Sequence, residues 1–165
     1  MKTTLNLNHI IQRFDIKNGL EREQFRKELV NMGQTVIPHL LELLEHPKQI
    51  LRWESMKALS EISHPTLIPT FIDKLESDEG DIRWMAAEGL INIGKEAVKP
   101  ILDSLIEKSD SVFILSGAHH VFYELFVQKQ LPENFPVQSL LPLLKKVGKE
   151  EMLKVEVFGV LSKLK

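Results

Sequence analysis

The chain has 165 residues, of which 43% are hydrophobic and 27% charged, and its formal net charge is −2. This length fits one domain or one short repeat array. Cysteine is absent, which excludes disulfides and thiolate metal sites. The sequence has neither an apolar run of the roughly 18 residues that span a bilayer nor the apolar core of a signal peptide, so we expect a cytoplasmic protein with no membrane partner.

The N-terminal residues predict a short helix from Asn8 to Phe14, with Asn8 as its N-cap. Apolar side chains of this helix would cover the open end of the array that follows, as terminal repeats require. A first pair of helices is expected next, over residues 20–32 and 36–45.

Two stretches in the middle of the chain, residues 51–75 and 81–105, repeat one helix-pair design at an offset of 31 positions. A fixed period of this size in helical segments is typical of solenoids. At this offset Arg52–Trp53 matches Arg83–Trp84, Leu59 matches Leu90, and Ile62 matches Ile93. Pro38, Pro69 and Pro100 also follow one another at the same offset. From the three- and four-residue apolar spacing we expect burial of Leu59, Ile62, Ala86, Leu90, Ile93 and Leu102.

A resemblance to a known family rests on residues 82–94, which read IRWMAAEGLINIG, and on residues 97–102, which read AVKPIL. These segments resemble HEAT repeats of the short bacterial kind, also called phycobilin-lyase HEAT-like. The likeness extends over residues 21–144. It implies an all-α fold, a right-handed α-solenoid of about four to five HEAT-like helix pairs, and surfaces that bind partners.

The predicted organisation is a single solenoid over residues 1–165. Residues 1–20 form an N-terminal cap, residues 21–147 form four helix pairs, and residues 148–165 form a C-terminal half-repeat without a partner helix. The fourth pair is irregular, because a long connection over residues 129–138 is inserted relative to the repeat period.

No catalytic motif, phosphate-binding loop or metal-binding motif is present, so we expect a protein that is not an enzyme and has no cofactor. Some HEAT-repeat enzymes hold two iron atoms through His-Glu dipeptides, and none of the six histidines here precedes a glutamate. His119 and His120 are adjacent, and neighbouring side chains on a helix point about 100° apart, which does not favour one shared metal. A structural role and a functional one, as ligand contact or proton switch, both stay open.

Two repeated features have alternative readings. Arg52 and Arg83 are expected to bridge neighbouring repeats through Asp81 or loop carbonyls, because the guanidinium offers five donors in one plane. Trp53 and Trp84 follow them and would form an outer row that Ile114 continues. Such a row is either a partner-binding surface or the cover of a seam between repeats.

Acidic residues also recur with the repeat period. Glu45, Glu76 and Glu107 are 31 positions apart, and Glu42 and Asp73 form a second partial row. Residues 41–110 carry 8 basic and 14 acidic side chains, a balance of −6. The rows are either a solvated helix face or a ridge that receives a basic segment of a partner.

We therefore expect a non-enzymatic scaffold that presents a repeat surface to a partner protein, with a basic segment of that partner on the acidic ridge. One alternative is an accessory protein of the phycobilin-lyase type that handles a tetrapyrrole. A further alternative is a HEAT-like protein of nucleic-acid binding or alkyl-DNA repair. The acidic middle of the chain argues against this last one, because it repels polyanions.

Overall fold

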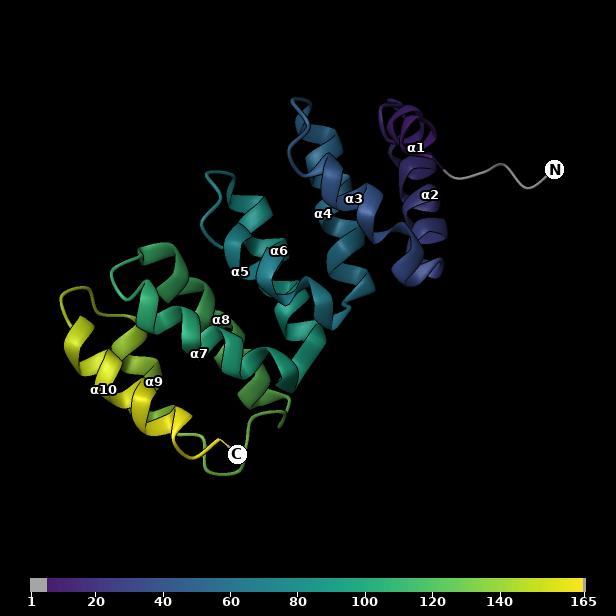
Figure 1. Ribbon diagram of the computed structural model, residues 1–165. Helices are drawn as coiled ribbons and strands as arrows, with labels where there is room; N and C mark the ends of the chain where they lie inside the picture. Colours follow the sequence, from purple (N-terminus) through teal and green to yellow (C-terminus); the bar gives the residue numbers. More distant parts are fainter. Residues whose placement is uncertain (1–5, 165) are drawn as a thin grey trace. The chain divides into compact units, whose positions relative to one another are not determined.

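In the computed structural model, residues 6–164 are described, and every regular element within them is helical (Figure 1). The all-α prediction is therefore confirmed. Residues 1–5 of the predicted cap and residue 165 of the predicted half-repeat lie outside the described residues. No helix within the described range is both long enough and apolar enough to cross a bilayer.

The chain forms two compact units, residues 1–64 and 65–165. The first unit contains four α-helices: α1 (Leu7–Phe14), α2 (Gly19–Asn31), α3 (Ile37–Leu43) and α4 (Gln49–Ile62). Helix α4 is the centre of this unit, since α1, α2 and α3 all pack against it. The predicted cap on α1 is wrong by two residues, because Asn6 and not Asn8 accepts the hydrogen bond from the His9 N–H, at 2.9 Å.

A buried ion cluster joins α2 to α4 in the first unit. Arg26 is 6% exposed and its Nη1 donates to Oε2 of Glu54 at 2.6 Å. Glu54 is 2% exposed and its other oxygen accepts from Nε of Arg22 at 3.1 Å. Arg26 also donates through Nε to the more exposed Glu61 at 3.2 Å. Both oxygens of Glu54 are thus occupied, as a buried carboxylate requires.

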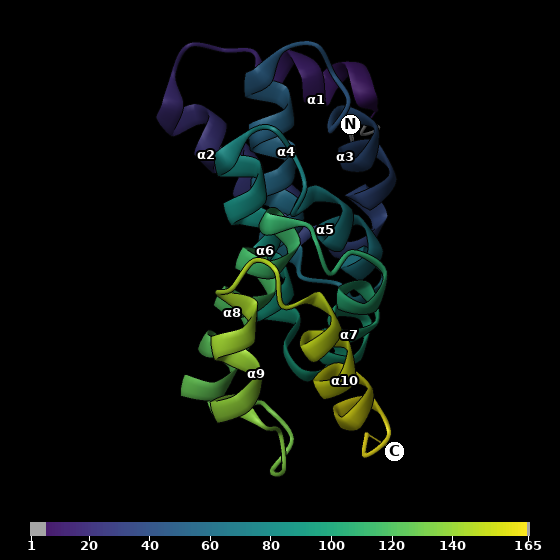
Figure 2. The same ribbon diagram turned by 90° about the vertical axis from the view of Figure 1, so that its left-hand side faces the viewer.

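The second unit contains six α-helices in two layers. They are α5 (Ile68–Lys74), α6 (Gly80–Ile93), α7 (Val98–Glu107), α8 (Val112–Val127), α9 (Val137–Leu144) and α10 (Glu150–Leu161). In one layer α8 packs between α6 and α9, and in the other α7 packs between α5 and α10. Figure 2 shows the two layers side by side.

The end of the chain departs from the expected half-repeat, because α10 packs against both α7 and α9. The connection over residues 128–136 contains no helix, and the helix that follows it, α9, is the one expected as the second helix of the fourth pair. Helix α9 instead continues the layer of α6 and α8, and α10 continues the layer of α5 and α7. The last two helices therefore form a pair.

The core follows most of the predicted positions. Leu59, Ala86, Leu90 and Leu102 have no exposed surface, as predicted. The prediction of burial for Ile62 and Ile93 is wrong, since both are only half-buried. Each is the last residue of its helix, where the chain turns toward solvent.

A close contact sets the spacing of α5 and α6 in the second unit. A Cβ atom added at Gly89 would lie 2.5 Å from Cε2 of Phe71, whose ring is fully buried. Gly94 ends α6 with φ of 84°, a conformation that suits glycine. Glycine is therefore required at these two positions for different reasons, close approach and backbone conformation.

The repeated arginines fix the turn before their own helices. Each donates through Nη1 to a carbonyl six residues earlier, which confirms loop carbonyls rather than Asp81 as the acceptors. The acceptors are Ile16 O for Arg22 (2.6 Å), His46 O for Arg52 (2.7 Å) and Ser77 O for Arg83 (2.5 Å). Arg22 therefore belongs to the same series, although its offset from Arg52 is 30 and not 31.

Candidate binding groove across α6, α8 and α9

Two large aromatic side chains stand on either side of a hollow between α6 and α8. Trp84 of α6 is 58% exposed and Phe113 of α8 is 44% exposed. Both line a cavity of about 490 Å³, together with Leu75, Ala87 and Gly117. An exposed pair of large rings around a small-residue surface is the composition expected of a partner-binding site.

Small residues keep α8 close to the rest of the unit and shape this hollow. A Cβ atom added at Gly117 would lie 2.8 Å from Cδ2 of Leu75, a side chain that is almost fully buried. Ala87 of α6 is also buried beside the hollow. The local sequence Ser116–Gly117 thus lets α8 approach Leu75 at the end of α5. These small residues line the hollow together with the larger rings of Trp84 and Phe113.

Trp84 is held in place by a histidine from the neighbouring helix. Its ring stacks on that of His120, with centroids 4.6 Å apart and planes 29° apart. Nε2 of His120 lies 3.2 Å from Oε1 of Glu88, one turn along α6 from Trp84. This arrangement fixes the indole while leaving more than half of it in solvent, which lowers the entropy lost when a ligand binds.

The opposite side of the hollow combines a cation with an aromatic ring. The guanidinium of Arg83 lies 4.2 Å from the ring centroid of Phe113. The same guanidinium donates to the Ser77 carbonyl, so its position is fixed from both sides. Phe113 therefore has a rigid support on one face, and positive charge is held at the rim of the hollow.

A second hollow continues the first across α8 toward α9. It has a volume of about 620 Å³ and is lined by His119, Tyr123, Leu141, Pro142 and Lys145. The rings of His119 and Tyr123 stack with centroids 6.4 Å apart and planes 6° apart. Because His119 lines both hollows, we treat them as one feature, called the α6–α8–α9 groove below.

The surroundings of His119 favour its neutral form. Burial lowers the pKa of His119 from its usual value, and the charges of Lys145 and His120 lower that pKa further. A neutral imidazole stacks on Tyr123 without the desolvation cost of a buried charge. The lowered pKa therefore favours His119 as an aromatic surface of the groove over a cation.

The structure places the predicted tryptophan row differently from the sequence reading. Trp84 lies in the groove, whereas Trp53 is half-buried on α4, with Nζ of Lys57 4.9 Å from its ring centroid. The prediction that Ile114 continues the row is wrong, because Ile114 is fully buried on the inner side of α8. Phe113, its neighbour, has the exposed position instead.

The predicted acidic residues do not form one uninterrupted row of free charge. Glu42, Glu45, Asp73 and Glu107 are exposed. Glu76 is half-buried, pairs with Nζ of Lys108 and accepts a hydrogen bond from Oγ of Ser111 at 2.9 Å. The hydrogen bond from Lys108 lowers the pKa of Glu76, which indicates a structural tie between two turns.

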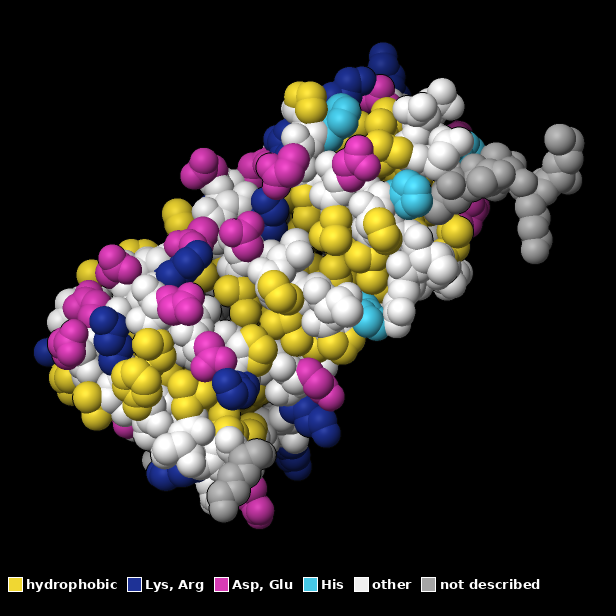
Figure 3. Space-filling model, in the orientation of Figure 1, with side chains coloured by type: hydrophobic (Ala, Val, Ile, Leu, Met, Phe, Trp, Pro, Cys, Tyr) yellow, Lys and Arg dark blue, Asp and Glu magenta, His cyan; other side chains and the backbone are white. Residues whose placement is uncertain are grey.

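Lysine and arginine side chains interrupt the acidic surface of the second unit. On the face seen in Figure 3, acidic and basic side chains of residues 65–165 are interspersed. Nζ of Lys74 lies 3.7 Å from Asp73, and the charges of Glu76, Asp73 and Glu107 all act on Lys108. The sequence reading counted the acidic and basic side chains of this region, but it did not show which cations face the recurring acids.

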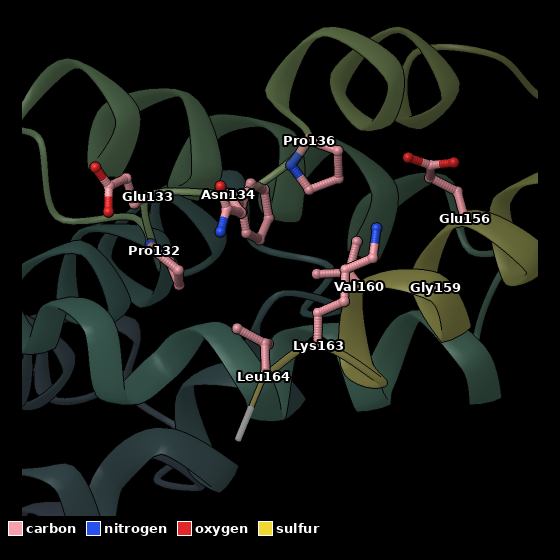
Figure 4. Close-up of a pocket in the computed structure, with 10 residues that line it drawn as sticks. Pro132, Glu133, Asn134, Pro136, Glu156, Gly159, Val160, Lys163 and Leu164 are labelled. Atoms are coloured by element: carbon pink, nitrogen blue, oxygen red, sulfur yellow. The ribbon is translucent and has the colours of Figure 1, made fainter.

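A further cavity lies between residues 132–136 and the end of α10, with a volume of about 540 Å³ (Figure 4). Its two carboxylates, Glu133 and Glu156, lie on opposite sides of the view and do not converge. Glu156 is engaged with Oγ of Ser139 at 2.5 Å. The cavity therefore offers less for recognition than the groove.

Within residues 6–164, no group of three or more His, Asp or Glu side chains is arranged to hold a metal ion.

The helix pairs of each unit, joined by short turns, define an α-solenoid protein. A family model of HEAT repeats matches residues 37–118, so this part of the chain consists of HEAT repeats. None of the curated proteins matches the sequence. A solved structure, the complex of CpcE and CpcF of phycocyanin lyase from Nostoc sp. PCC7120, has the same fold: the TM-score is 0.59 at 20% identity, over 94% of this chain and 97% of that chain.

This similarity corrects one prediction. The expectation that the protein is not an enzyme rested on the lack of a catalytic motif in the sequence. A chain of the same fold belongs to a protein described as a lyase, so the lack of a motif is not an argument against catalysis in this fold. At 20% identity the similarity shows the fold, and it assigns no reaction to this chain.

Proposed function

We propose that this protein is a HEAT-repeat adaptor that binds a partner protein in the α6–α8–α9 groove. The observation that carries the proposal is the exposed Trp84, which is 58% exposed yet fixed by stacking on His120. Tryptophan is among the residues that dominate binding energy at interfaces, and a pre-ordered ring loses little entropy on binding. A partner protein also agrees with the similar structure, which is a complex of two different chains.

The acidic residues of each unit are secondary contacts of this adaptor, suited to a basic segment of the partner. Glu42 and Glu45 in the first unit are exposed, and so are Asp73 and Glu107 in the second. Exposed charges of this kind act mainly on the rate of association and are screened by salt. We therefore propose that the groove supplies most of the binding energy and that the acidic residues mainly increase the rate of association.

Affinity capture from the native lysate with purified variants tests this proposal. Trp84→Ala should lower recovery of the captured partner about tenfold or more, because loss of a central aromatic hot-spot residue costs about 2 kcal/mol or more. Glu107→Lys should reduce recovery less, and its effect should disappear at high salt. Glu107 replaces Glu76 as the charge probe, since reversal at Glu76 would also break its contacts with Lys108 and Ser111.

The matched control is Phe158→Ala on α10. Phe158 is also 58% exposed but lies outside the residues that line the groove. Recovery should be unchanged in this variant, and the far-ultraviolet circular dichroism of all variants should agree. Equal recovery with Trp84→Ala and wild type would refute the groove. Loss with Glu107→Lys alone would assign the site to the acidic surface.

A second candidate is a role in handling a tetrapyrrole, as part of a lyase with two kinds of subunit. It is favoured by the fold shared with a chain of the phycocyanin lyase complex and by the aromatic and histidine side chains of the groove. Mixing the purified protein with a free bilin and recording visible absorbance and fluorescence separates the two candidates. A saturable spectral change that Trp84→Ala abolishes would support the tetrapyrrole role.

A further inference from the structure

We infer that the α6–α8–α9 groove binds an extended, proline-rich segment that also carries carboxylate side chains; the inference rests on the proposed function and specifies its ligand. The regular backbone that lines the groove is helical, from α6, α8 and α9. It therefore offers no free strand edge to which a β-strand of a partner could be added.

The aromatic walls suit proline. Trp84 and Phe113 border the first hollow, and Tyr123 with His119 borders the second. Grooves lined by aromatic rings recognise polyproline II segments, which need no backbone pairing because their peptide groups stay solvated. Such segments are already extended before binding, so less conformational entropy is lost than with a flexible peptide.

The spacing expected for the two hollows from helix packing matches the polyproline repeat. The first hollow lies between α6 and α8, and the second lies between α8 and α9. Packed helices are roughly 8–10 Å apart, so the hollows recur at about this distance. A polyproline II helix repeats every three residues, or about 9 Å. Prolines at positions i and i+3 of the ligand would therefore enter the two hollows at once.

The interruption by α8 argues against an amphipathic helix as the ligand. A bound helix places side chains at i, i+3, i+4 and i+7 into one continuous apolar trough. Here α8 separates the two hollows, and its half-buried His119 lines both of them. An extended segment that crosses α8 can place one side chain in each hollow and does not need a continuous trough.

The charge of the groove selects acidic residues beside the prolines. Arg83 lines the first hollow, Lys145 lines the second, and the described lining residues of both include no carboxylate. Glu88 on α6 is engaged with His120, whose ring stacks on Trp84. Carboxylates on the ligand would lie near uncompensated positive charge, which favours association and the correct partner.

The experiment uses fluorescence anisotropy with a labelled peptide of about eight residues, in which two prolines at i and i+3 are flanked by aspartates. One comparison peptide has both prolines replaced by alanine, and another has the aspartates replaced by lysine. The full-length protein should bind the first peptide saturably. Each comparison peptide should bind about tenfold more weakly, which corresponds to the loss of one good contact.

Three protein variants locate the site. Trp84→Ala should weaken peptide binding about tenfold through the first hollow, and Tyr123→Ala should do so through the second. Phe158→Ala, outside the groove, should bind like wild type. If Trp84→Ala is misfolded by circular dichroism, Tyr123→Ala still decides the question, because it removes one ring from an exposed position.

The outcomes separate the inference from the proposed function. Equal binding of the proline and alanine peptides, or no binding of either, overturns the inference. If partner capture nevertheless depends on Trp84, the adaptor function stands with a ligand of another kind. If Tyr123→Ala binds like wild type, the two-hollow recognition is wrong. If partner capture is also insensitive to Trp84, the proposed function fails together with the inference.

Discussion

Replacing Glu54 by alanine should lower the free energy of unfolding by about 3–5 kcal/mol, the usual result of breaking a buried ion pair. Glu54 is 2% exposed and accepts hydrogen bonds from both Arg22 and Arg26. Without the carboxylate, the buried guanidinium of Arg26 keeps only the contact with Glu61. The cost is therefore mainly that of an uncompensated charge and unfilled hydrogen bonds.

Urea denaturation followed by Trp53 fluorescence measures this effect. Trp53 lies on α4 next to Glu54, and Trp84→Phe removes the other tryptophan of the chain. Glu61→Ala is the matched control, because Glu61 contacts the same arginine from a more exposed position and should cost less than about 1 kcal/mol. A change below about 1 kcal/mol for Glu54→Ala would show that the cluster does not hold α2 to α4.

Leu90→Ala should cost about 2–5 kcal/mol, the range for large-to-small changes in a core. Leu90 has no exposed surface and lies on the face of α6 that forms the core of the second unit. Val127→Ala on α8 is the control, since Val127 is exposed and should change stability by less than about 0.5 kcal/mol. Trp84 fluorescence reports on this unit, and a loss below about 1 kcal/mol would contradict the burial of Leu90.

The repeat period was sufficient to predict the fold class and most helices. Matching Leu59 with Leu90 and Arg52 with Arg83 placed two buried positions and two turn-fixing arginines in their observed roles. The period failed where the chain departs from it. The inserted connection after α8 was predicted, but its effect was not: α9 continues the layer of α6 and α8, and α10 continues that of α5 and α7.

The groove was only partly predictable, because its contacts join residues far apart in the sequence. Trp84 was a candidate from its repeat position, but its stacking partner His120 comes from the next repeat and lies half-buried at the surface, which the repeat period does not indicate. A shift of one residue decided between Phe113 and Ile114, since neighbouring residues on a helix point about 100° apart. An alignment of repeats at a fixed offset cannot distinguish two neighbouring positions, because the offset itself varies by one residue along the chain.

The acidic rows show a related difficulty. Period matching identified Glu76 and Glu107 as equivalent, yet only Glu76 is tied to Ser111 and pairs with Lys108. The cation lies 32 positions away from Glu76, at a place where the earlier repeats offer no signal. Whether a recurring acidic side chain is paired depends on residues of the next repeat. Matching positions at a fixed offset identifies the acids but does not identify those partners.

The central claim, that partners bind in the α6–α8–α9 groove, is tested most directly by site-specific photo-cross-linking in native lysate. The photoreactive residue p-benzoylphenylalanine would replace Trp84 in one variant, Glu107 in a second and Leu20 in a third. Leu20 is exposed in the first unit and serves as the background control. The account predicts a discrete cross-linked partner from position 84, which excess unlabelled wild-type protein suppresses. A partner cross-linked from position 107 and none from position 84 would contradict it.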